Sequence, residues 1–357
     1  MGKYTKHIVI MRLSAMGDVA MCYPVLKALA GQHPAIKVTF ISRPYFQDFF
    51  ADLPNVHFFP VDLKERHQGI KGLYHLFKDI KALDKIDAFA DFHDVIRSKI
   101  VRTFFRIQGY PVAVIDKGRK GKKALTRRHN KVLTPLKHST ERYGDVLRTL
   151  GIDISLDHSL HKNSDRKIAE NVASLLEKAG LQPKIGIAPF AFHRGKRIPL
   201  EKIERLIEKI HTDIGAAIYL FGGGAEEMEK INQLTEKYPY VTNAVAHLNL
   251  YDELQLIGEL DVMISMDSAN MHLASMQGVP VLSIWGSTHQ YAGFLGYGQS
   301  PAHIVEISPE ALPCRPCSVF GNKPCFRGDY ACMERIEVAA IMDKLHHMLA
   351  TATDTHN

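Results

Sequence analysis

The chain has 357 residues, of which 46% are hydrophobic and 23% are charged, a composition typical of a soluble globular protein with two domains of ordinary size. It shows no signal peptide and no run of about 18 apolar residues, so we expect a cytoplasmic protein without a membrane-spanning helix. The net charge of +7 is unevenly distributed, because residues 1–162 carry 28 basic and 15 acidic side chains and the remainder carries 17 and 23.

Strand and helix patterns alternate along the first half of the chain. An apolar strand is predicted at His7–Leu13, followed by a tight loop at Ser14–Asp18 and a helix at Val19–Ala30. Further strands are predicted at Lys37–Ser42, Val56–Val61, Ala88–Phe92 and Val112–Ile115, and helices at Leu73–Leu83 and Ile96–Arg106. This alternation predicts an α/β domain with a doubly wound, mostly parallel sheet.

The second half repeats the same order of elements. Periodicity is lost between Leu150 and Asn163, so we place a domain boundary near residue 160 and expect domains at 1–160 and 161–357. Strands are predicted at Lys184–Ala188 and Ala216–Phe221, and helices at Arg166–Ala179, Glu201–His211, Glu226–Lys237 and Val338–Leu349, the last one following a cysteine-rich segment, 314–332. Two similar α/β domains predict a cleft between them.

The positive charge is concentrated between Arg97 and Lys131. This segment holds twelve basic residues and one acidic residue, Asp116. Such a density indicates an anionic partner, namely an acidic glycan, an acidic membrane surface or nucleic acid, although a solvated basic loop has the same composition. Aromatic residues are sparse in the segment, which disfavours nucleic acid. The residues chosen as candidate contacts to an anionic acceptor are Arg97, Arg102, Arg119 and Lys120.

The most informative stretch runs from Asp261 to Thr288. It reads as a strand, a turn, a helix and a second buried strand, and either Asp267 or Ser268 can cap the helix. The helix start gathers free backbone N–H groups beyond the carboxyl end of a strand, which suits a phosphate. The alternative is an ordinary turn whose polar residues, His272 among them, are caps or core groups.

The loop at Ser14–Asp18 is a second candidate site. Gly17 lets the backbone approach a ligand, and we assign Ser14 and Gly17 to donor binding. Asp18 follows the first strand and is a candidate general base for a hydroxyl nucleophile, unless it merely caps the next helix. No G-x-G-x-x-G pattern follows this strand, which argues against a dinucleotide-dependent oxidoreductase.

Two loops of the second half complete the candidate site. His193 and Lys196 belong to a cationic loop after the strand Lys184–Ala188 and can neutralise a diphosphate, or simply lie on the surface. In the second loop, Gly223 and Gly224 permit close approach of a nucleotide, and we assign them to donor binding. Glu226 and Glu227, also donor-binding candidates, can accept hydrogen bonds from a ribose. The alternative interpretation is a tight turn followed by an acidic first helical turn. No D-x-D pattern occurs, so we expect no metal ion on the diphosphate.

Four late cysteines follow the spacing C-x2-C-x7-C-x6-C. In a chain without an export signal this pattern is typical of a structural zinc site, and packed reduced thiols and disulfides are the alternatives. The residues are Cys314, Cys317, Cys325 and Cys332.

Several motifs in their order along the chain resemble glycosyltransferase family 9, the ADP-heptose:lipopolysaccharide heptosyltransferases. They are RLSAMGDV (Arg12–Val19), HRGKRIP (His193–Pro199), FGGGAEE (Phe221–Glu227), MDSANMHLAS (Met266–Ser275) and WGST (Trp285–Thr288). The resemblance implies a GT-B fold with two Rossmann-like domains facing a central cleft, the first binding the acceptor and the second the nucleotide-sugar donor. It also implies inverting transfer that needs no cofactor, by an enzyme at the inner face of the inner membrane.

The resemblance further assigns roles to residues of this chain. Asp18 resembles the general base, Lys196 the cation on the donor diphosphate, and Asp267 the aspartate beside the donor sugar. Ser268, Ala269 and His272 match the phosphate-binding helix start, and Glu226 or Glu227 the ribose contact. Two positions depart from the family pattern, because Ala269 replaces a usual glycine and Ile198 a common aromatic residue. These departures leave another nucleotide sugar or another envelope glycan as the alternative substrates.

Overall fold

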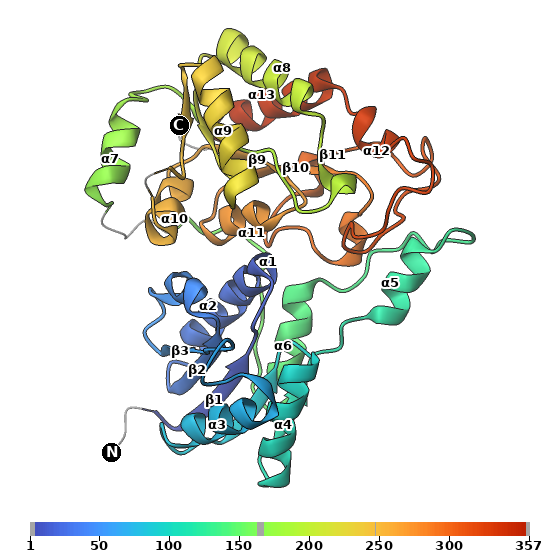
Figure 1. The fold of residues 1–357 in the computed structure, drawn as a ribbon. Helices are drawn as coiled ribbons and strands as arrows, with labels where there is room; N and C mark the ends of the chain where they lie inside the picture. Colours follow the sequence, from blue (N-terminus) through green and yellow to red (C-terminus); the bar gives the residue numbers. More distant parts are fainter. Residues whose placement is uncertain (1–3, 163–167, 247, 355–357) are drawn as a thin grey trace. The chain divides into compact units, whose positions relative to one another are not determined.

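The computed structural model describes residues 4–162, 168–246 and 248–354 (Figure 1). Its contacts divide the chain into two compact units. The first unit consists of Met1–Lys117 and Lys137–Asp157, and the second of Gly118–Leu136 and His158–Asn357. The main division therefore falls close to residue 160. Residues 118–136, however, pack with the second unit although they precede that division in the sequence.

The first unit is built on a parallel sheet with the strand order β3-β2-β1-β4-β5. Its register pairs Ile8 of β1 with Val38 of β2 on one side and with Ala88 of β4 on the other. The central strands β1, β2 and β4 are apolar runs buried on both faces, as expected for a sheet covered by helices on each side, whereas the edge strands β3 and β5 are partly exposed. Their bounds are β1 Lys6–Met11, β2 Ile36–Ser42, β3 Val56–Pro60, β4 Ala88–Asp91 and β5 Val112–Val114.

Helices cover both faces of this sheet. Helix α3 packs against α4 on one face, and α2 packs against α6 on the other. Buried side chains of α3 and α4, such as Leu76 and Phe105, join Val9 and Phe89 of the strands in one core. The helices are α1 Met16–Ala20, α2 Cys22–Gln32, α3 Gly69–Lys81, α4 Ile96–Ile107 and α6 Ser139–Thr149, with a 3₁₀ helix, η1, at Pro44–Phe50.

The second unit has a parallel sheet with the order β11-β10-β9-β6-β7-β8. Ile187 of β6 pairs with Ile264 of β9 and with Leu220 of β7. These side chains form a core with helices that pack on the same face, including Ile207 of α8 and Leu345 of α13. The strands are β6 Lys184–Ala188, β7 Ala217–Leu220, β8 Val241–Asn243, β9 Val262–Met266, β10 Val281–Trp285 and β11 Ile304–Glu306.

Helices of the second unit lie on both faces of its sheet (Figure 1). Helix α8 packs against α13, and α10 packs against α7 and α11. The α-helices are α5 Arg119–Thr126, α7 Glu170–Glu177, α8 Leu200–Lys209, α9 Ala225–Lys237, α10 Leu250–Gly258, α11 Ala269–Met276, α12 Ala331–Glu334 and α13 Val338–Asp354. Shorter turns are η2 Arg194–Lys196, η3 Ile210–Ile214, η4 Gln290–Ala292 and η5 Pro301–His303.

The predicted strands and helices are found with shifts of a few residues at their ends, and the predicted doubly wound α/β architecture is confirmed. The loop expected at Ser14–Asp18 is partly helical, because α1 begins at Met16. The helix expected from Arg166 begins at Glu170 in the part of the chain that is described, and residues 163–167 lie outside it. Helices α6 and α10 were not expected from the sequence. No helix among the described residues is long and apolar enough to cross a membrane.

The strand order explains where a ligand site can form. In each sheet the chain starts in the middle, with β1 or β6, and winds first to one side and then to the other. The winding reverses between β1 and β4 in the first unit and between β6 and β9 in the second. Ligands of open α/β sheets bind outside the carboxyl ends of the strands at such reversals. The loops after β1, β4, β6 and β9 therefore lie at the positions that favour binding.

Candidate functional site

Lys196 and Asp267 come together at the reversal point of the second unit. Lys196 lies in η2 after β6, and Asp267 directly follows β9. The Lys196 ammonium lies 2.8 Å from Oδ2 of Asp267 and donates to the Asp267 carbonyl at 3.0 Å. Thr288, which follows β10, donates its hydroxyl to the same Oδ2 at 2.7 Å. Three loops that the sequence separates thus meet at one buried carboxylate.

Tight backbone packing holds the Lys196 loop in place. The Ser287 N–H donates to the Gly195 carbonyl at 2.8 Å, and a Cβ on Gly195 would lie 2.5 Å from the Ser287 hydroxyl. A Cβ on Gly286 would lie 2.4 Å from the Gly195 carbonyl oxygen. Neither position has room for a side chain, because a Cβ on Gly195 would meet the Ser287 side chain and a Cβ on Gly286 would meet the Gly195 backbone. Gly321, at a φ of +82°, packs against the Lys196 side chain in the same way.

The start of helix α11 lies beside this carboxylate. Ser268 is its N-cap residue, but its side chain makes no capping hydrogen bond and lies 3.2 Å from the Ser265 hydroxyl instead. Ala269 is the first helical residue, and His272 is buried one turn later. Because no side chain caps them, the N–H groups of the first turn and the positive end of the helix dipole are available to an anion.

The other cations of the Lys196 loop have structural partners. Arg197 donates to the carbonyls of Ala191 and Phe192, and Arg194 pairs with Glu334. Burial, followed by the charges of Lys196 and Arg197, lowers the pKa of His193, so His193 is neutral near pH 7. Of the cluster expected from the sequence, Lys196 is the cation directed at Asp267.

The glycine-rich loop after β7 is shaped by its own acidic residues. Glu227 accepts a hydrogen bond from the Gly223 N–H at 2.9 Å, and Gly224 has a φ of +82° at the start of α9. Glu226 is exposed and forms an ion pair with Lys230 at 2.7 Å; the hydrogen bond from Lys230 lowers the pKa of Glu226. Glu226 is therefore the more accessible acceptor for a ribose hydroxyl, while Glu227 keeps the loop in shape.

Asp18 lies at the reversal point of the first unit, after β1. It forms an ion pair with Arg12, whose guanidinium is buried. The Ala15 N–H donates to Oδ2 of Asp18 at 3.3 Å, and the Tyr143 hydroxyl donates to the Asp18 carbonyl at 3.3 Å. Asp18 therefore takes part in capping α1, as the alternative interpretation held, yet its side chain stays partly exposed. Ser14 and Gly17 lie on the same loop and are half-buried.

Several basic residues that were not selected from the sequence also lie at this reversal point. Burial, together with the charges of Arg12 and Lys117, lowers the pKa of His93 to about 3, so His93 is neutral. Its Nδ1 accepts from the Leu13 N–H at 3.3 Å. Arg43 also acts on His93 electrostatically. The signal was available in the sequence for three of these residues, because Arg43, His93 and Lys117 each follow the end of a predicted strand by one or two residues. Arg12 lies inside the predicted strand His7–Leu13 and follows β1 only as the structure has it.

The four cations chosen from the sequence as acceptor contacts are divided between the two units. Arg97 is exposed on α4, whereas Arg102 is mostly buried and pairs with Asp91 at 2.7 Å and Asp94 at 3.0 Å. Arg119 and Lys120 lie on α5, which belongs to the second unit. The dense positive charge between Arg97 and Lys131 is therefore divided between two units and is partly neutralised by internal ion pairs.

The sequence model of one known family matches a stretch that contains most of the residues described above. The sequence model of glycosyltransferase family 9 (heptosyltransferase) matches residues 76–318, about two thirds of the chain. The chain belongs to glycosyltransferase family 9. It is therefore a glycosyltransferase of the lipopolysaccharide heptosyltransferase family.

Curated and solved relatives of this family 9 protein agree with the assignment. It is 23% identical over 290 residues to the lipopolysaccharide core heptosyltransferase OpsX of Haemophilus influenzae, which covers 78% of this chain and 79% of OpsX. A family 9 glycosyltransferase from Veillonella parvula superposes with a TM-score of 0.72 at 21% identity, covering 98% and 99% of the two chains. The E. coli heptosyltransferase WaaC, solved with ADP and with ADP-2-deoxy-2-fluoro heptose, superposes with a TM-score of 0.64 at 17% identity, covering 96% and 99%. These likenesses show a GT-B fold with two α/β domains.

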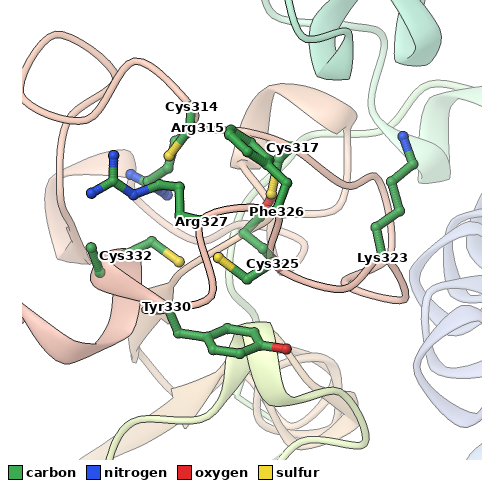
Figure 2. Close-up of a pocket in the computed structure, with 11 residues that line it drawn as sticks. Cys314, Arg315, Cys317, Lys323, Cys325, Phe326, Arg327, Tyr330 and Cys332 are labelled. Carbon is green, nitrogen blue, oxygen red and sulfur yellow. The ribbon is translucent and has the colours of Figure 1, made fainter.

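The cysteine-rich segment of this family 9 protein surrounds one small space. Figure 2 shows the four cysteines among the residues that line this space. The cavity has a volume of about 10 Å³, close to the room that one water molecule needs. All four are free, and burial raises the pKa of Cys317 and raises that of Cys332 to about 11. In the described part of the chain no three His, Cys, Asp or Glu side chains converge closely enough to hold a metal ion. The expected zinc site therefore stays a prediction.

Arg315, within that segment, supports the donor-side loops and was missed from the sequence. It is fully buried and donates to the carbonyls of Trp285, Gly286 and Thr288 and to the Glu306 carboxylate. Burial by itself would raise the pKa of Glu306, but the hydrogen bond from His289 and the charge of Arg315 outweigh burial and lower that pKa. Arg315 thus fixes the loop that presents Thr288 to Asp267. No local sequence signal marks an arginine when these partners lie 9 to 30 residues away.

Proposed function

We propose that this protein transfers a heptose from ADP-heptose to an acidic inner-core sugar of a lipopolysaccharide acceptor, with inversion and without a metal ion. The observation that carries the proposal is the pairing of Lys196 with Asp267 beside the uncapped start of α11, at the reversal point of the second sheet. A cation and free N–H groups at such a place suit a diphosphate. The ADP and ADP-sugar complexes of WaaC support the choice of donor.

In this proposal the second unit receives the donor. Lys196, the first N–H groups of α11 and His272 stabilise the diphosphate as negative charge develops on it in the transition state. Asp267 and Thr288 hold the Lys196 ammonium in position before the donor arrives. Glu226 accepts hydrogen bonds from the ribose. Because these groups supply the positive charge, no divalent ion is needed on the leaving diphosphate.

The first unit activates the acceptor. Asp18 takes the proton of the acceptor hydroxyl, whose oxygen forms a bond to the anomeric carbon while the bond from that carbon to the diphosphate oxygen breaks. ADP leaves with the bonding electron pair, and attack from the opposite face inverts the configuration. Arg12 orients the Asp18 carboxylate. Arg43 and Lys117, near the same sheet edge, supply positive charge for an acidic acceptor sugar. A lipid-linked acceptor places the enzyme peripherally at the inner face of the inner membrane.

Two measurements test this function. Asp18→Asn is expected to reduce kcat with ADP-heptose and a Kdo-lipid acceptor by roughly 100-fold or more, since it removes the base and keeps the shape. The matched control is Asp213→Asn, whose carboxylate belongs to an exposed ion pair with Lys209. Wild-type turnover in Asp18→Asn would refute the assigned base. ADP should raise the melting temperature while UDP and GDP do not; equal protection by UDP or GDP would point to another nucleotide sugar.

A further inference from the structure

Large apolar side chains are exposed together on helices α3 and α4 of the first unit. Ile70 is 70% exposed, Ile96 is 77% and Ile107 is 73%, and Tyr74 is also exposed. Single exposed apolar residues are normal on soluble proteins, but a group of them on adjoining elements marks an interaction surface. The two helices pack against each other (Figure 1).

These residues form two stripes that lie next to each other. On α3, Ile70 and Tyr74 are four residues apart, and on α4, Ile96, Ile100, Phe104 and Ile107 recur every three or four residues. The rings of Tyr74 and Phe104 meet edge to face at 5.3 Å, which joins the two stripes. The opposite sides of both helices are already buried on the sheet through side chains such as Leu76 and Phe105. Ile100 and Phe104 are partly buried against this core, so the apolar surface in excess of what the core requires consists of Ile70, Tyr74, Ile96 and Ile107.

A groove of about 340 Å³ lies between the C-terminal parts of α3 and α4 and includes Tyr74 of one stripe and Phe104 and Ile107 of the other. Its walls are aromatic and aliphatic, and two lysines stand at its edge: Lys78 lies over the Tyr74 ring at 4.9 Å and Lys81 over the Phe77 ring at 5.6 Å. Lysines in such positions cover apolar surface with their stems and keep their ammonium groups in water. The groove is lined by Tyr74, Phe77, Lys78, Lys81, Phe104, Ile107 and Gln108.

The charge around the stripes is strongly positive. The two helices contain seven basic residues and one acidic residue, Asp79, which is bound by Arg66 and His67. One of the seven, Arg102, is held by internal ion pairs. The exposed cations that remain are Lys71, Lys78, Lys81, Arg97 and Arg106, together with Lys99, which is exposed but lies 3.8 Å from the Asp94 carboxylate. An apolar stripe bordered by cations is complementary to an anionic lipid surface, whereas two copies of the chain that met through this face would bring like charges together.

We propose that the exposed face of α3 and α4 docks on an anionic lipid bilayer. Ile70, Ile96 and Ile107 enter the boundary between headgroups and acyl chains, and the lysines and arginines bind the headgroup phosphates. The reason for this enzyme to dock on a bilayer rests on the proposed function, since a lipid-linked acceptor lies in such a bilayer. The surface assigned here is α3 with α4, rather than the whole basic segment from Arg97 to Lys131.

Vesicle sedimentation of the full chain tests the docking face. We expect binding to vesicles of phosphatidylglycerol and phosphatidylcholine, weak binding to phosphatidylcholine alone, and a fall in binding as salt is raised. Ile70→Glu and Ile107→Glu should each weaken binding about tenfold or more, since each removes one inserted side chain and adds a negative charge. The matched control is Leu181→Glu in the second unit, because Leu181 is an aliphatic side chain that is even more exposed, at 105%, and lies outside this face.

The outcomes separate this proposal from the proposed function. Unchanged vesicle binding by Ile70→Glu and Ile107→Glu, or an equal loss in Leu181→Glu, would overturn the docking face. A wild-type dimer that these variants dissociate, without vesicle binding, would identify the face as a contact between copies and would also overturn it. Turnover with a delipidated, soluble acceptor should stay unchanged in the variants. Vesicle binding without any heptose transfer would refute the proposed function alone.

Discussion

The Lys196 ammonium lies 2.8 Å from the Asp267 carboxylate, so a cation after β6 and an anion after β9 neutralise each other at the reversal point of the second sheet. Both side chains are largely withdrawn from water, and the Thr288 hydroxyl donates to the same carboxylate oxygen. The lysine is thereby held in one place before a ligand arrives. Preset positive charge of this kind costs little reorganisation when charge develops on a leaving group.

Replacing Lys196 is expected to affect both catalysis and stability. In Lys196→Met we expect kcat for heptose transfer to fall by roughly 100-fold or more, since a preorganised stabiliser of the leaving group is lost. The melting temperature should also fall, because Asp267 is left buried without its cation. Steady-state kinetics and thermal unfolding measure the two effects. Lys209→Met, at an exposed lysine, is the control and should change neither.

A double variant separates the two roles of Lys196. Lys196→Met combined with Asp267→Asn removes the unpaired buried charge, so the melting temperature should recover toward that of the wild type. The value of kcat should stay low because the cation is still missing. Recovery of kcat together with stability would show that Lys196 serves only to compensate Asp267.

Arg315 is expected to position the donor-side loop. Arg315→Met leaves several buried carbonyls without their donor and leaves Glu306 with His289 as its remaining partner, and we expect a loss of about 3 kcal/mol or more in the free energy of unfolding. At a temperature where the variant is folded, KM for the donor should rise much more than KM for the acceptor. An exposed arginine, Arg335, provides the control Arg335→Met. Equal changes in both KM values would indicate general destabilisation instead.

The stability of the protein should depend on pH through Glu253 of α10. Burial raises the pKa of this carboxyl from its ordinary value of 4.5 to about 7. The folded state therefore binds the Glu253 proton more tightly than the unfolded state does. The resulting stabilisation is fully present below pH 4.5 and is lost as the pH rises to about 7. Glu253→Gln should raise the free energy of unfolding by on the order of 3 kcal/mol at pH 8 and little at pH 4.5. A gain of the same size at both pH values would contradict the shifted pKa.

The cysteine segment yields a prediction about metal content. We expect purified protein to contain one zinc ion per chain, lost in Cys317→Ser, and EDTA treatment to leave the heptose transfer rate unchanged if the ion is structural. Cys22→Ser is the control, since Cys22 is buried in α2, away from the segment in the sequence. Five titratable thiols and no bound metal would instead establish that the four cysteines are packed in reduced form.

The sequence by itself determined where the strands end and therefore where the site residues lie. The continuous apolar run Lys184–Ala188 located β6 to the residue, and the polar residues that follow the strands pointed to Asp18, Lys196 and Asp267. These features are readable because strand and helix periodicity, turn glycines and caps depend on neighbours in the chain. The order of the elements likewise implied the doubly wound sheets.

Only the tertiary structure decided which of these side chains meet and which cations are already paired. Lys131 donates to the carbonyls of Pro313, Cys314 and Arg315, about 180 residues away, which draws residues 118–136 into the second unit. Arg102 is already paired with Asp91 and Asp94. Arg315 supports the Thr288 loop, and the sequence of that loop does not indicate this contact. Such pairings arise from the packing of distant segments, and packing leaves no periodic pattern in the local sequence.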